Sequence, residues 1–404
     1  MSLDDAEGVI SPEEMQTIKQ SLENESLNSA AEKIQKYFDQ LDKTVLNMAV
    51  TGVSGKGKST FINTIRGLGD EEEASAPTGE TETTMDATPY SHPKFPNIKL
   101  WDLPGIGTEK FRPDQYLEQV GFQRYDFFII ISSERFTCND ANLAREIHKM
   151  GKHFYFARSK VDESLRAKAV RKNDYNETST LKLIREDCIT GLQKLGVESP
   201  RVFLISSFDP EKYDFTLLQE EMEKDLPQEK RHVFLLALPN ITESVYQKKK
   251  KALQSDIWRV ALLSGAAAAV PITGLGFAVD VKVLKREISK YYRAFGLDKA
   301  SLRSLADRVK VPVEELRKVT KSGIKEDLTD EIVIKMLTKV AGGGLMASKG
   351  VASMLPLFGS LASGGIAFCT SYCVLKSCLE ELAEDANLVL LRAFPNEAPK
   401  GKCV

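Results

Sequence analysis

Short apolar runs alternate with stretches of helical periodicity from Thr44 to about Leu226. Several runs are apolar throughout, which is typical of strands buried on both faces of a parallel sheet. Helices are expected between them, for example over 141–150 and 180–195. This alternation predicts a doubly wound, mostly parallel α/β domain. The expected strands are Leu46–Thr51, Met85–Tyr90, Ile98–Leu103, Phe127–Ser132, Phe154–Arg158 and Val202–Ser206.

The regions on both sides of this domain have helical patterns only. A capping box begins at Ser11, and apolar residues recur at helical spacing up to Leu41. From Gln228 onward the pattern is again helical and is interrupted by prolines. We therefore predict an N-terminal helical segment over 1–43, the α/β domain over 44–227 and a C-terminal helical segment over 228–404. The two helical segments are expected to form one all-α domain.

Two segments of the C-terminal part, 260–279 and 350–375, contain no charged residue. Each is long enough to cross a bilayer. Both are rich in Gly, Ala and Ser and contain a proline, which equally suits helices buried in a helical core. The two interpretations are core helices or a hairpin that inserts into or touches a membrane. The basic run Lys248–Lys251 is either a solvated helix face or a contact for anionic lipid.

The overall composition narrows the class of protein. The formal net charge is -2, and basic and acidic residues are interleaved, so the chain is not expected to bind nucleic acid. Its 6 cysteines form no Cys-x-x-Cys pair, which indicates reduced thiols in a cytoplasmic protein. The acidic N-terminus has no apolar run and does not read as a signal peptide.

The stretch Gly52–Ser59 matches the phosphate-binding pattern G-x-x-x-x-G-K-[ST] between an expected strand and an expected helix. Its glycines allow the backbone N–H groups to face phosphate oxygens. Lys58 is expected to reach the β- and γ-phosphates, and Ser59 to bind Mg²⁺. The predicted nucleotide contacts of this loop are Gly52, Gly55, Gly57, Lys58, Ser59 and Thr60.

Asp102 and Gly105 form a D-x-x-G motif at the end of an expected strand. The carboxylate of Asp102 is expected to hold Mg²⁺ through water, and the Gly105 amide to meet the γ-phosphate. Behind a phosphate-binding loop, this motif is typical of nucleotide triphosphatases.

Ser159-Lys160-Val161-Asp162 follows another expected strand. An aspartate at position 162 can accept both donors on the guanine edge, so it would select guanine over adenine. Lys160 would lie along the base. Ser159 stands where asparagine or threonine is more usual. Ser206 and Ser207, after the last strand, are further candidates for contacts to the base.

A threonine-rich loop precedes Asp102 and is a candidate switch segment. Thr84 is our candidate for the magnesium shell, with Thr83 as the alternative. Ile106 occupies the position after D-x-x-G where many switch GTPases carry a glutamine, and its side chain cannot orient water. Glu82 is the nearest candidate carboxylate for that task. Arg66 and Arg112 are candidates to supply positive charge within or across a dimer.

These motifs resemble the immunity-related, interferon-inducible p47 GTPases. The resemblance rests on Gly52–Ser59 and on the segments that begin at Pro77, Trp101, Tyr125 and Leu238, and it covers roughly residues 10–310. Lys58 corresponds to the lysine subclass of the family. The resemblance implies a Ras-like P-loop GTPase domain between helical parts. It also implies nucleotide residues at Gly57, Lys58, Ser59, Thr84, Asp102, Lys160 and Asp162, with the switch glutamate at Glu82.

The family resemblance further implies GTP-dependent self-association, possible assembly with related GTPases, and action on the membranes of pathogen-containing vacuoles. The expected protein is cytoplasmic and peripherally associated with intracellular membranes, with Mg²⁺ as cofactor and GTP as substrate. Lys56 departs from the family pattern, and we expect it to point to solvent. The alternatives are a monomeric GTP switch whose partner completes the catalytic site, and a scaffold that binds nucleotide without hydrolysing it.

Overall fold

The computed structural model describes residues 27–79, 86–104, 118–134, 136–171, 175–269, 275–342 and 362–395. These residues divide into two compact units. One unit, Lys43–Thr242, contains the sheet, and the other combines α2 (Leu27–Lys43) with α10 (Glu243–Ala269) and the helices that follow it.

The first unit is built on a six-stranded sheet in the order β2-β3-β1-β4-β5-β6. Only β2 is antiparallel to its neighbour, so the expected doubly wound, mostly parallel sheet is confirmed. All residues of β4 are buried, as the continuous apolar run predicted. The strands are β1 (Leu46–Thr51), β2 (Thr88–Ser91), β3 (Ile98–Asp102), β4 (Phe127–Ser132), β5 (Phe154–Arg158) and β6 (Val202–Leu204).

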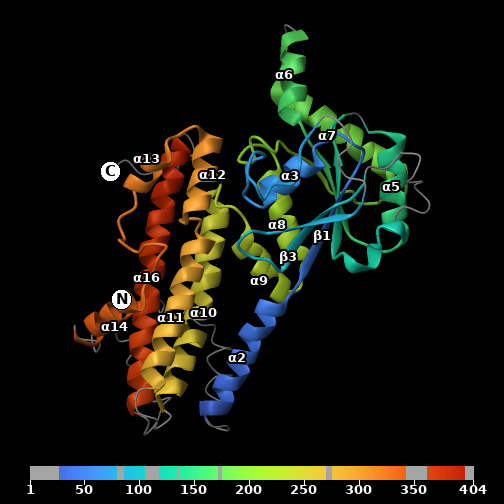
Figure 1. Cartoon of the computed structure of the whole chain (residues 1–404). Coiled ribbons are helices and arrows are strands. Elements are labelled where there is room, and N and C mark those ends of the chain that lie inside the picture. The colour runs from blue at the N-terminus through green and yellow to red at the C-terminus, as the bar shows by residue number, and fades with distance from the viewer. Residues whose placement is uncertain are drawn as a thin grey trace, which may run out of the picture. The chain divides into compact units, whose positions relative to one another are not determined.

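Helices cover the sheet of this unit (Figure 1). Two of them begin three residues earlier than expected because polar side chains cap them. Thr137 and Asp140 form a capping box at α5, and the Asn176 side chain accepts a hydrogen bond of 2.9 Å from the Ser179 amide at α7. The helices are α3 (Lys58–Ile65), α5 (Cys138–Lys149), α6 (Val161–Arg171), α7 (Glu177–Gln193), α8 (Phe215–Asp225) and α9 (Gln228–Ala237), with a short 3₁₀ helix η2 (Phe122–Arg124).

The boundary after the sheet unit lies at 242/243, not at the expected 227/228. Pro227 ends α8 and starts α9, but side-chain bonds keep α9 on the sheet unit. The Arg231 guanidinium donates to the carbonyls of Glu223 and Leu226, both at 3.1 Å. The Lys230 ammonium lies 2.5 Å from the Asp126 carboxylate, immediately before β4. The switch to purely helical pattern at Gln228 therefore does not mark a new unit.

The second unit is all helical. Long helices α10, α11 and α16 run side by side in it (Figure 1), and buried residues of α10 and α16 form much of its core. The helices after α10 are α11 (Leu275–Ala294), α12 (Lys299–Val309), α13 (Val313–Lys318), α14 (Asp330–Gly342) and α16 (Ala362–Ala393).

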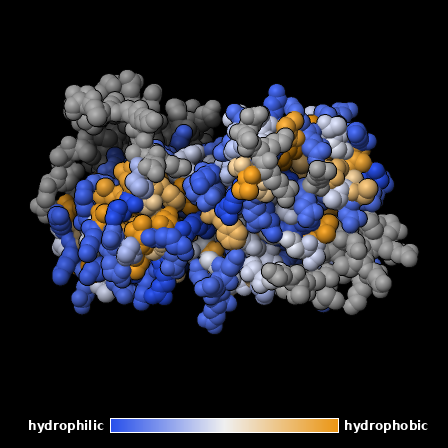
Figure 2. All heavy atoms as spheres, turned by 90° about the horizontal axis from the view of Figure 1, so that it is seen from above, coloured by the Kyte–Doolittle hydropathy of each residue, from blue (hydrophilic) through white to orange (hydrophobic). Residues whose placement is uncertain are grey.

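The described parts of the two uncharged segments belong to this core. Val260 and Leu262 of α10 and Phe368 and Leu375 of α16 are all buried. Across the described ranges, no helix is both long and apolar enough to cross a membrane. In the view of Figure 2 most of the described surface is hydrophilic, with apolar side chains scattered over both units.

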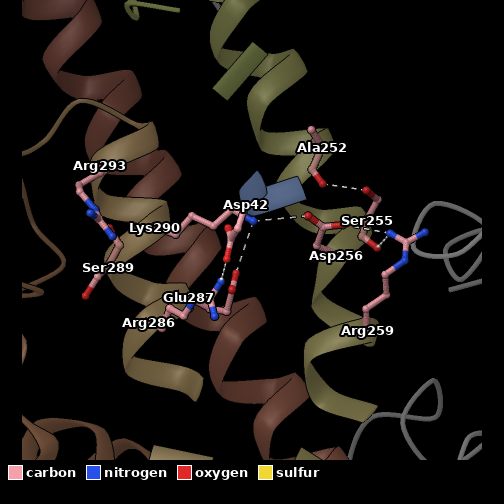
Figure 3. Close-up of polar contacts among 10 residues, drawn as sticks. All are labelled: Asp42, Ala252, Ser255, Asp256, Arg259, Arg286, Glu287, Ser289, Lys290 and Arg293. Carbon is pink, nitrogen blue, oxygen red and sulfur yellow. Dashed lines mark hydrogen bonds and ion pairs between the residues drawn. The ribbon is translucent and has the colours of Figure 1, made fainter. Parts of the chain in front are cut away.

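A cluster of charged side chains connects α10 and α11 inside the helical unit (Figure 3). The Lys290 ammonium lies 3.6 Å from Asp256 and 3.7 Å from Glu287, and Arg259 lies 2.9 Å from Asp256. Both carboxylates are buried. Burial alone would lower the pKa of Lys290, but Glu287 and Asp256 together raise it. The ammonium is therefore held in its charged form.

The same cations hold α2 against α10 and α11. The Arg259 guanidinium lies 5.0 Å from the centre of the Tyr37 ring, and the Lys290 ammonium lies 5.8 Å from that of Phe38. Arg286 forms an ion pair with Asp42 near the end of α2 (Figure 3). Charge and aromatic contacts, in addition to apolar packing, therefore attach the N-terminal helix to its unit.

The basic run Lys248–Lys251 on α10 is not uniformly solvated. Lys249 is 1% exposed, and its ammonium donates a hydrogen bond of 2.6 Å to the carbonyl of Ala294, the last residue of α11. A lysine at a helix C-terminus satisfies a carbonyl that has no partner within the helix. The expectation of a solvated or lipid-facing run is wrong for this residue.

Candidate nucleotide-binding site

The loop between β1 and α3 has the backbone geometry of a phosphate-binding loop. Gly52 has φ +140°, and a Cβ placed there would lie 2.2 Å from the Ile131 carbonyl of β4, so only glycine fits. Gly57, with φ +90°, precedes the first residue of α3 and has no side chain to cap it. The first amides of α3 therefore face a ligand site at a helix N-terminus, which favours phosphate.

Lys58 is the first residue of α3 and is 7% exposed. Its ammonium lies 3.4 Å from the carbonyl of Val53, so the side chain folds back over the loop. That placement holds the charge at the position where the motif requires it to meet phosphate oxygens.

Ser59 and Asp102 lie side by side, although 43 residues separate them in the sequence. The Ser59 hydroxyl donates a hydrogen bond of 2.8 Å to a carboxylate oxygen of Asp102, the last residue of β3. A hydroxyl and a carboxylate are oxygen ligands of the kind that Mg²⁺ prefers. No group of three or more His, Cys, Asp and Glu suited to a metal occurs in the described part of the chain. Mg²⁺ at phosphate sites takes most of its ligands from phosphate and water, so this pair fits the ion.

The loop after β5 is bonded to the phosphate-binding loop. The Ser159 hydroxyl donates a hydrogen bond of 2.8 Å to the carbonyl of Lys56. The Ser159 amide also donates to the carbonyl of Ser132, at 2.7 Å, at the end of β4. Serine at this position therefore still joins the two loops, although asparagine or threonine is more usual.

Lys160 has φ +53°, a conformation that is uncommon for a residue with a side chain. A Cβ placed on Gly57 would lie 3.9 Å from the Lys160 Cε, so the lysine side chain passes beside the phosphate-binding loop. Asp162 lies in the first turn of α6 and is partly exposed. Lys160 therefore lies next to the phosphate-binding loop, and Asp162 follows it in the first turn of α6.

Ser206 and Ser207 follow β6 at the same edge of the sheet. The Ser207 carbonyl accepts a hydrogen bond of 3.1 Å from Thr64 of α3, and the Ser206 hydroxyl accepts one of 3.2 Å from the Asp209 amide. The Val161 amide donates to the carbonyl of Ile205, at 3.3 Å, and so links this loop to the start of α6.

Lys56 does not point to solvent as expected. Its ammonium lies 2.9 Å from the carboxylate of Glu134, and its side chain is only 13% exposed. This bond lowers the pKa of Glu134. The partner could not be identified from the sequence because it follows a different strand, β4.

Arg158 is a second residue that the sequence pattern did not reveal. It is buried at the end of β5, and its guanidinium donates a hydrogen bond of 2.7 Å to the Ser159 carbonyl and one of 3.3 Å to the Ser164 hydroxyl. Burial lowers the pKa of Arg158. Through these hydrogen bonds, the buried arginine supports the loop that carries Ser159 and Lys160.

Arg66 is not exposed to supply charge to a dimer partner. It is 5% exposed, and its guanidinium donates to the carbonyls of Ala74 and Ser91, at 2.8 and 3.1 Å. The other residues expected around the γ-phosphate lie outside the described residues; they are Glu82, Thr83, Thr84, Gly105, Ile106 and Arg112.

The chain also matches known proteins. The family model described as "Interferon-inducible GTPase (IIGP)" matches residues 11–393. Interferon-inducible GTPase 5 of Bos taurus is 41% identical over 390 residues, which cover 96% of this chain and 84% of that protein. Interferon-gamma-inducible GTPase 10 of Mus musculus is 38% identical over 385 residues, or 95% of this chain and 89% of that protein.

Among solved structures, the LeoA bacterial dynamin GTPase from ETEC covers 88% of this chain and 71% of its own, with 12% identity and a TM-score of 0.36. The family model and the two relatives confirm the resemblance noted in the sequence. The chain belongs to the interferon-inducible GTPase family and is a GTPase.

Proposed function

We propose that this chain hydrolyses GTP with Mg²⁺ bound between Ser59 and Asp102. The observation that carries this proposal is the 2.8 Å contact of these two side chains at the N-terminus of α3. Lys58 neutralises the β- and γ-phosphates, and the amides of Gly55 and Gly57 bind their oxygens. Bound Mg²⁺ would supply charge neutralisation across the same phosphates.

Guanine selection is assigned to Asp162, with Lys160 along the base and Ser159 securing the loop. The Ser159 bond to Lys56, at 2.8 Å, fixes the separation between the loop for the base and the loop for the phosphates. Thr84 is the proposed threonine ligand of Mg²⁺, and Thr60, Gly105, Ser206 and Ser207 complete the proposed contacts to nucleotide.

Self-association is the proposed activator of hydrolysis. Ile106 cannot orient the attacking water, so Glu82 or a group from a second copy must do so. The test is the rate of GTP turnover per protein molecule at increasing protein concentration, with GTP-dependent light scattering in parallel. Specific activity that rises with concentration supports self-association, and constant specific activity contradicts it.

We further propose that the protein is cytoplasmic and acts on intracellular membranes in interferon-induced defence, as family membership suggests. Deleting the C-terminal segment would not test membrane binding cleanly. Helix α16 packs along α10 in the helical core, so the deletion would also disrupt the fold. Charge reversal at Lys250 and Lys251, which are not buried, leaves the core bond of Lys249 intact.

The test is co-sedimentation of the K250E/K251E variant with anionic liposomes, in GDP and in a GTP analogue. Loss of binding relative to the unchanged protein would identify this basic face as a lipid contact. Unchanged binding of the variant would contradict that contact, and absence of binding by the unchanged protein would contradict the membrane proposal.

The alternatives are separable by experiment. A monomeric switch would show constant specific activity and would need a partner for fast turnover. A scaffold that binds nucleotide without turnover would keep its cellular activity after Lys58→Ala. The intact set of Lys58, Ser59 and Asp102, which hydrolysis requires at the phosphates, favours the hydrolysing alternatives.

A further inference from the structure

Arg158 is the last residue of β5 and lies directly before the base loop, residues 159–162. It is only 6% exposed. Its Nη1 donates a hydrogen bond of 2.7 Å to the Ser159 carbonyl, and its Nη2 donates one of 3.3 Å to the Ser164 hydroxyl in the first turn of α6. One buried side chain therefore bonds the chain both before and after the residues that are proposed to contact the base.

Ser164 extends this support to Lys160. The Ser164 hydroxyl, which accepts the bond from Arg158, donates a hydrogen bond of 3.2 Å to the Lys160 carbonyl. The Ser164 amide donates to the same carbonyl, also at 3.2 Å. These bonds close the turn of α6 that carries Asp162. The guanidinium, the serine hydroxyl and the lysine carbonyl thus form a chain of hydrogen bonds along the base loop.

The backbone of Lys160 needs such support. Its φ of +53° lies in the left-handed region, which is unfavourable for a residue with a side chain. A conformation of this kind persists only where the surrounding contacts fix it. Arg158 bonds the carbonyl of the peptide group that precedes Lys160, and Ser164 bonds the carbonyl of the peptide group that follows it. Both peptide planes that define the Lys160 backbone are therefore held.

The contribution of Arg158 is not duplicated by the backbone. The peptide group after Lys160 has a second support, because the Val161 amide donates to the Ile205 carbonyl at 3.3 Å. Among the described residues, no group other than Arg158 bonds the Ser159 carbonyl. The orientation of the peptide group before Lys160 therefore depends on the arginine.

The arginine is costly as a purely structural residue. Burial lowers the pKa of Arg158, and the carboxylates of Glu134, Asp140 and Asp187 oppose this effect only through space. A buried charge that is not bonded to a counter-ion destabilises the fold. What arginine offers at this position is its planar fork of donors, which can reach two acceptors at once.

We propose that Arg158 is a positioning residue for guanine selection, which fixes the backbone between Ser159 and Ser164 so that Asp162 faces the base. This inference rests on the role in base selection that is proposed for Asp162. A correctly placed carboxylate accepts a hydrogen bond from the exocyclic amine of guanine. Hypoxanthine, the base of inosine nucleotides, lacks this amine, so displacement of Asp162 reduces the preference for guanosine over inosine nucleotides.

The experiment uses the full-length chain with Mg²⁺ and measures the affinities of GDP and inosine diphosphate (IDP) by competition against fluorescent GDP. The unchanged protein should prefer GDP by at least about ten-fold, the net value of a hydrogen bond to a charged group. R158K keeps the charge but lacks the planar fork, so this preference should fall by at least about three-fold. A merely structural role would weaken both nucleotides equally and leave their ratio unchanged.

Variants of Ser164 test the same chain of bonds without replacing a buried arginine. S164A removes the acceptor of Arg158 and the donor to the Lys160 carbonyl, and should lower the preference for GDP in the same direction as R158K. S164T keeps the hydroxyl and should bind both nucleotides like the unchanged protein. If R158K is insoluble, S164A decides the question.

The matched control is R66Q. Arg66 is also buried, at 5% exposed, and its guanidinium donates to the carbonyls of Ala74 and Ser91, neither of which belongs to the base loop. R66Q should leave the ratio of the GDP and IDP affinities unchanged. An unchanged ratio in R158K, or an equal fall of the ratio in R66Q, would overturn the inference.

The D162A variant separates this inference from the proposed function on which it rests. If D162A and the unchanged protein show the same ratio of GDP to IDP affinity, Asp162 does not select guanine, and the inference about Arg158 falls with the proposed base site. If D162A abolishes the preference and R158K keeps it, only the inference about Arg158 fails.

Discussion

The hydroxyl of Ser159 donates a hydrogen bond of 2.8 Å to the carbonyl of Lys56, across two loops that lie 103 residues apart in sequence. Replacement by alanine removes the bond and leaves a carbonyl to be satisfied by water. Ser159→Ala should weaken GDP and GTP about equally, by roughly three- to ten-fold, the net value of one hydrogen bond. Titration of fluorescent nucleotides measures both affinities. Ser159→Thr keeps the hydroxyl and should bind like the unchanged chain, and a loss confined to GTP would contradict this account.

The pair of Lys56 and Glu134 makes a separate prediction. Since Glu134 is 73% exposed, the coupling should be small, less than about five-fold in nucleotide affinity, and should weaken as salt is added. The measurement is a double-mutant cycle with Lys56→Ala and Glu134→Ala. Additive effects of the two substitutions would show that the pair does not act on nucleotide binding.

The pH dependence of this coupling follows from the lowered pKa of Glu134. A carboxylate with a lowered pKa contributes above the pKa of an ordinary glutamate, about 4.3, and loses its contribution as the pH falls through the lowered value. The coupling between Lys56 and Glu134 should therefore be constant from about pH 5 upward. A decline between pH 6 and pH 8 would assign the effect to another group.

Asp162 makes a prediction about base selection. Asp162→Asn replaces one acceptor oxygen by an NH₂ donor. This donor cannot pair with the exocyclic amine of guanine, but it can pair with the carbonyl that xanthine carries in place of that amine. The variant should lose GTP affinity by at least about 100-fold and gain affinity for XTP. Competition between the two nucleotides measures the change. Retention of GTP binding without a gain for XTP would remove Asp162 from the base site.

Lys290 makes a prediction about stability. Lys290→Met leaves the buried carboxylates of Asp256 and Glu287 without one of their cations and should destabilise the helical unit by about 3 kcal/mol. Lys285→Met is the control on the same helix, because its pair with Asp330 is exposed, and it should cost at most about 1 kcal/mol. The fluorescence of Trp258, in a Trp101→Phe background, follows unfolding of this unit in urea. Equal effects of the two substitutions would contradict the role of Lys290 in neutralising the two buried carboxylates.

The sheet could be predicted where its strands are mostly apolar. The bounds of β1, β4 and β5 agree with the expected ranges because strands buried on both faces carry their own signal in sequence. The phosphate-binding loop was found for a similar reason, since its glycines and Lys58 lie within one short segment.

Features that depend on contacts between distant residues could not be predicted. The Glu134 partner of Lys56, the two carbonyls that Arg66 reaches and the bonds of Arg231 to the end of α8 leave no periodic signal. A long polar side chain is predicted to be solvated unless a partner is visible in the sequence, and the partners of these three residues are not. Burial of such side chains depends on where the fold brings a carbonyl or a carboxylate.

The buried bond of Lys249 to Ala294 changes how the basic run of α10 counts toward an anionic surface. Each lysine near such a surface contributes about 1 kcal/mol of attraction, so four adjacent lysines suggest four such contributions. The Lys249 ammonium is buried against the end of α11. At most Lys248, Lys250 and Lys251 can therefore add their charges to the attraction toward an anionic surface. The decrease of liposome affinity with salt concentration should therefore reflect at most three lysines of this run. A variant with all four lysines neutralised would lose the buried bond of Lys249 as well, so its weaker binding could come from a folding defect.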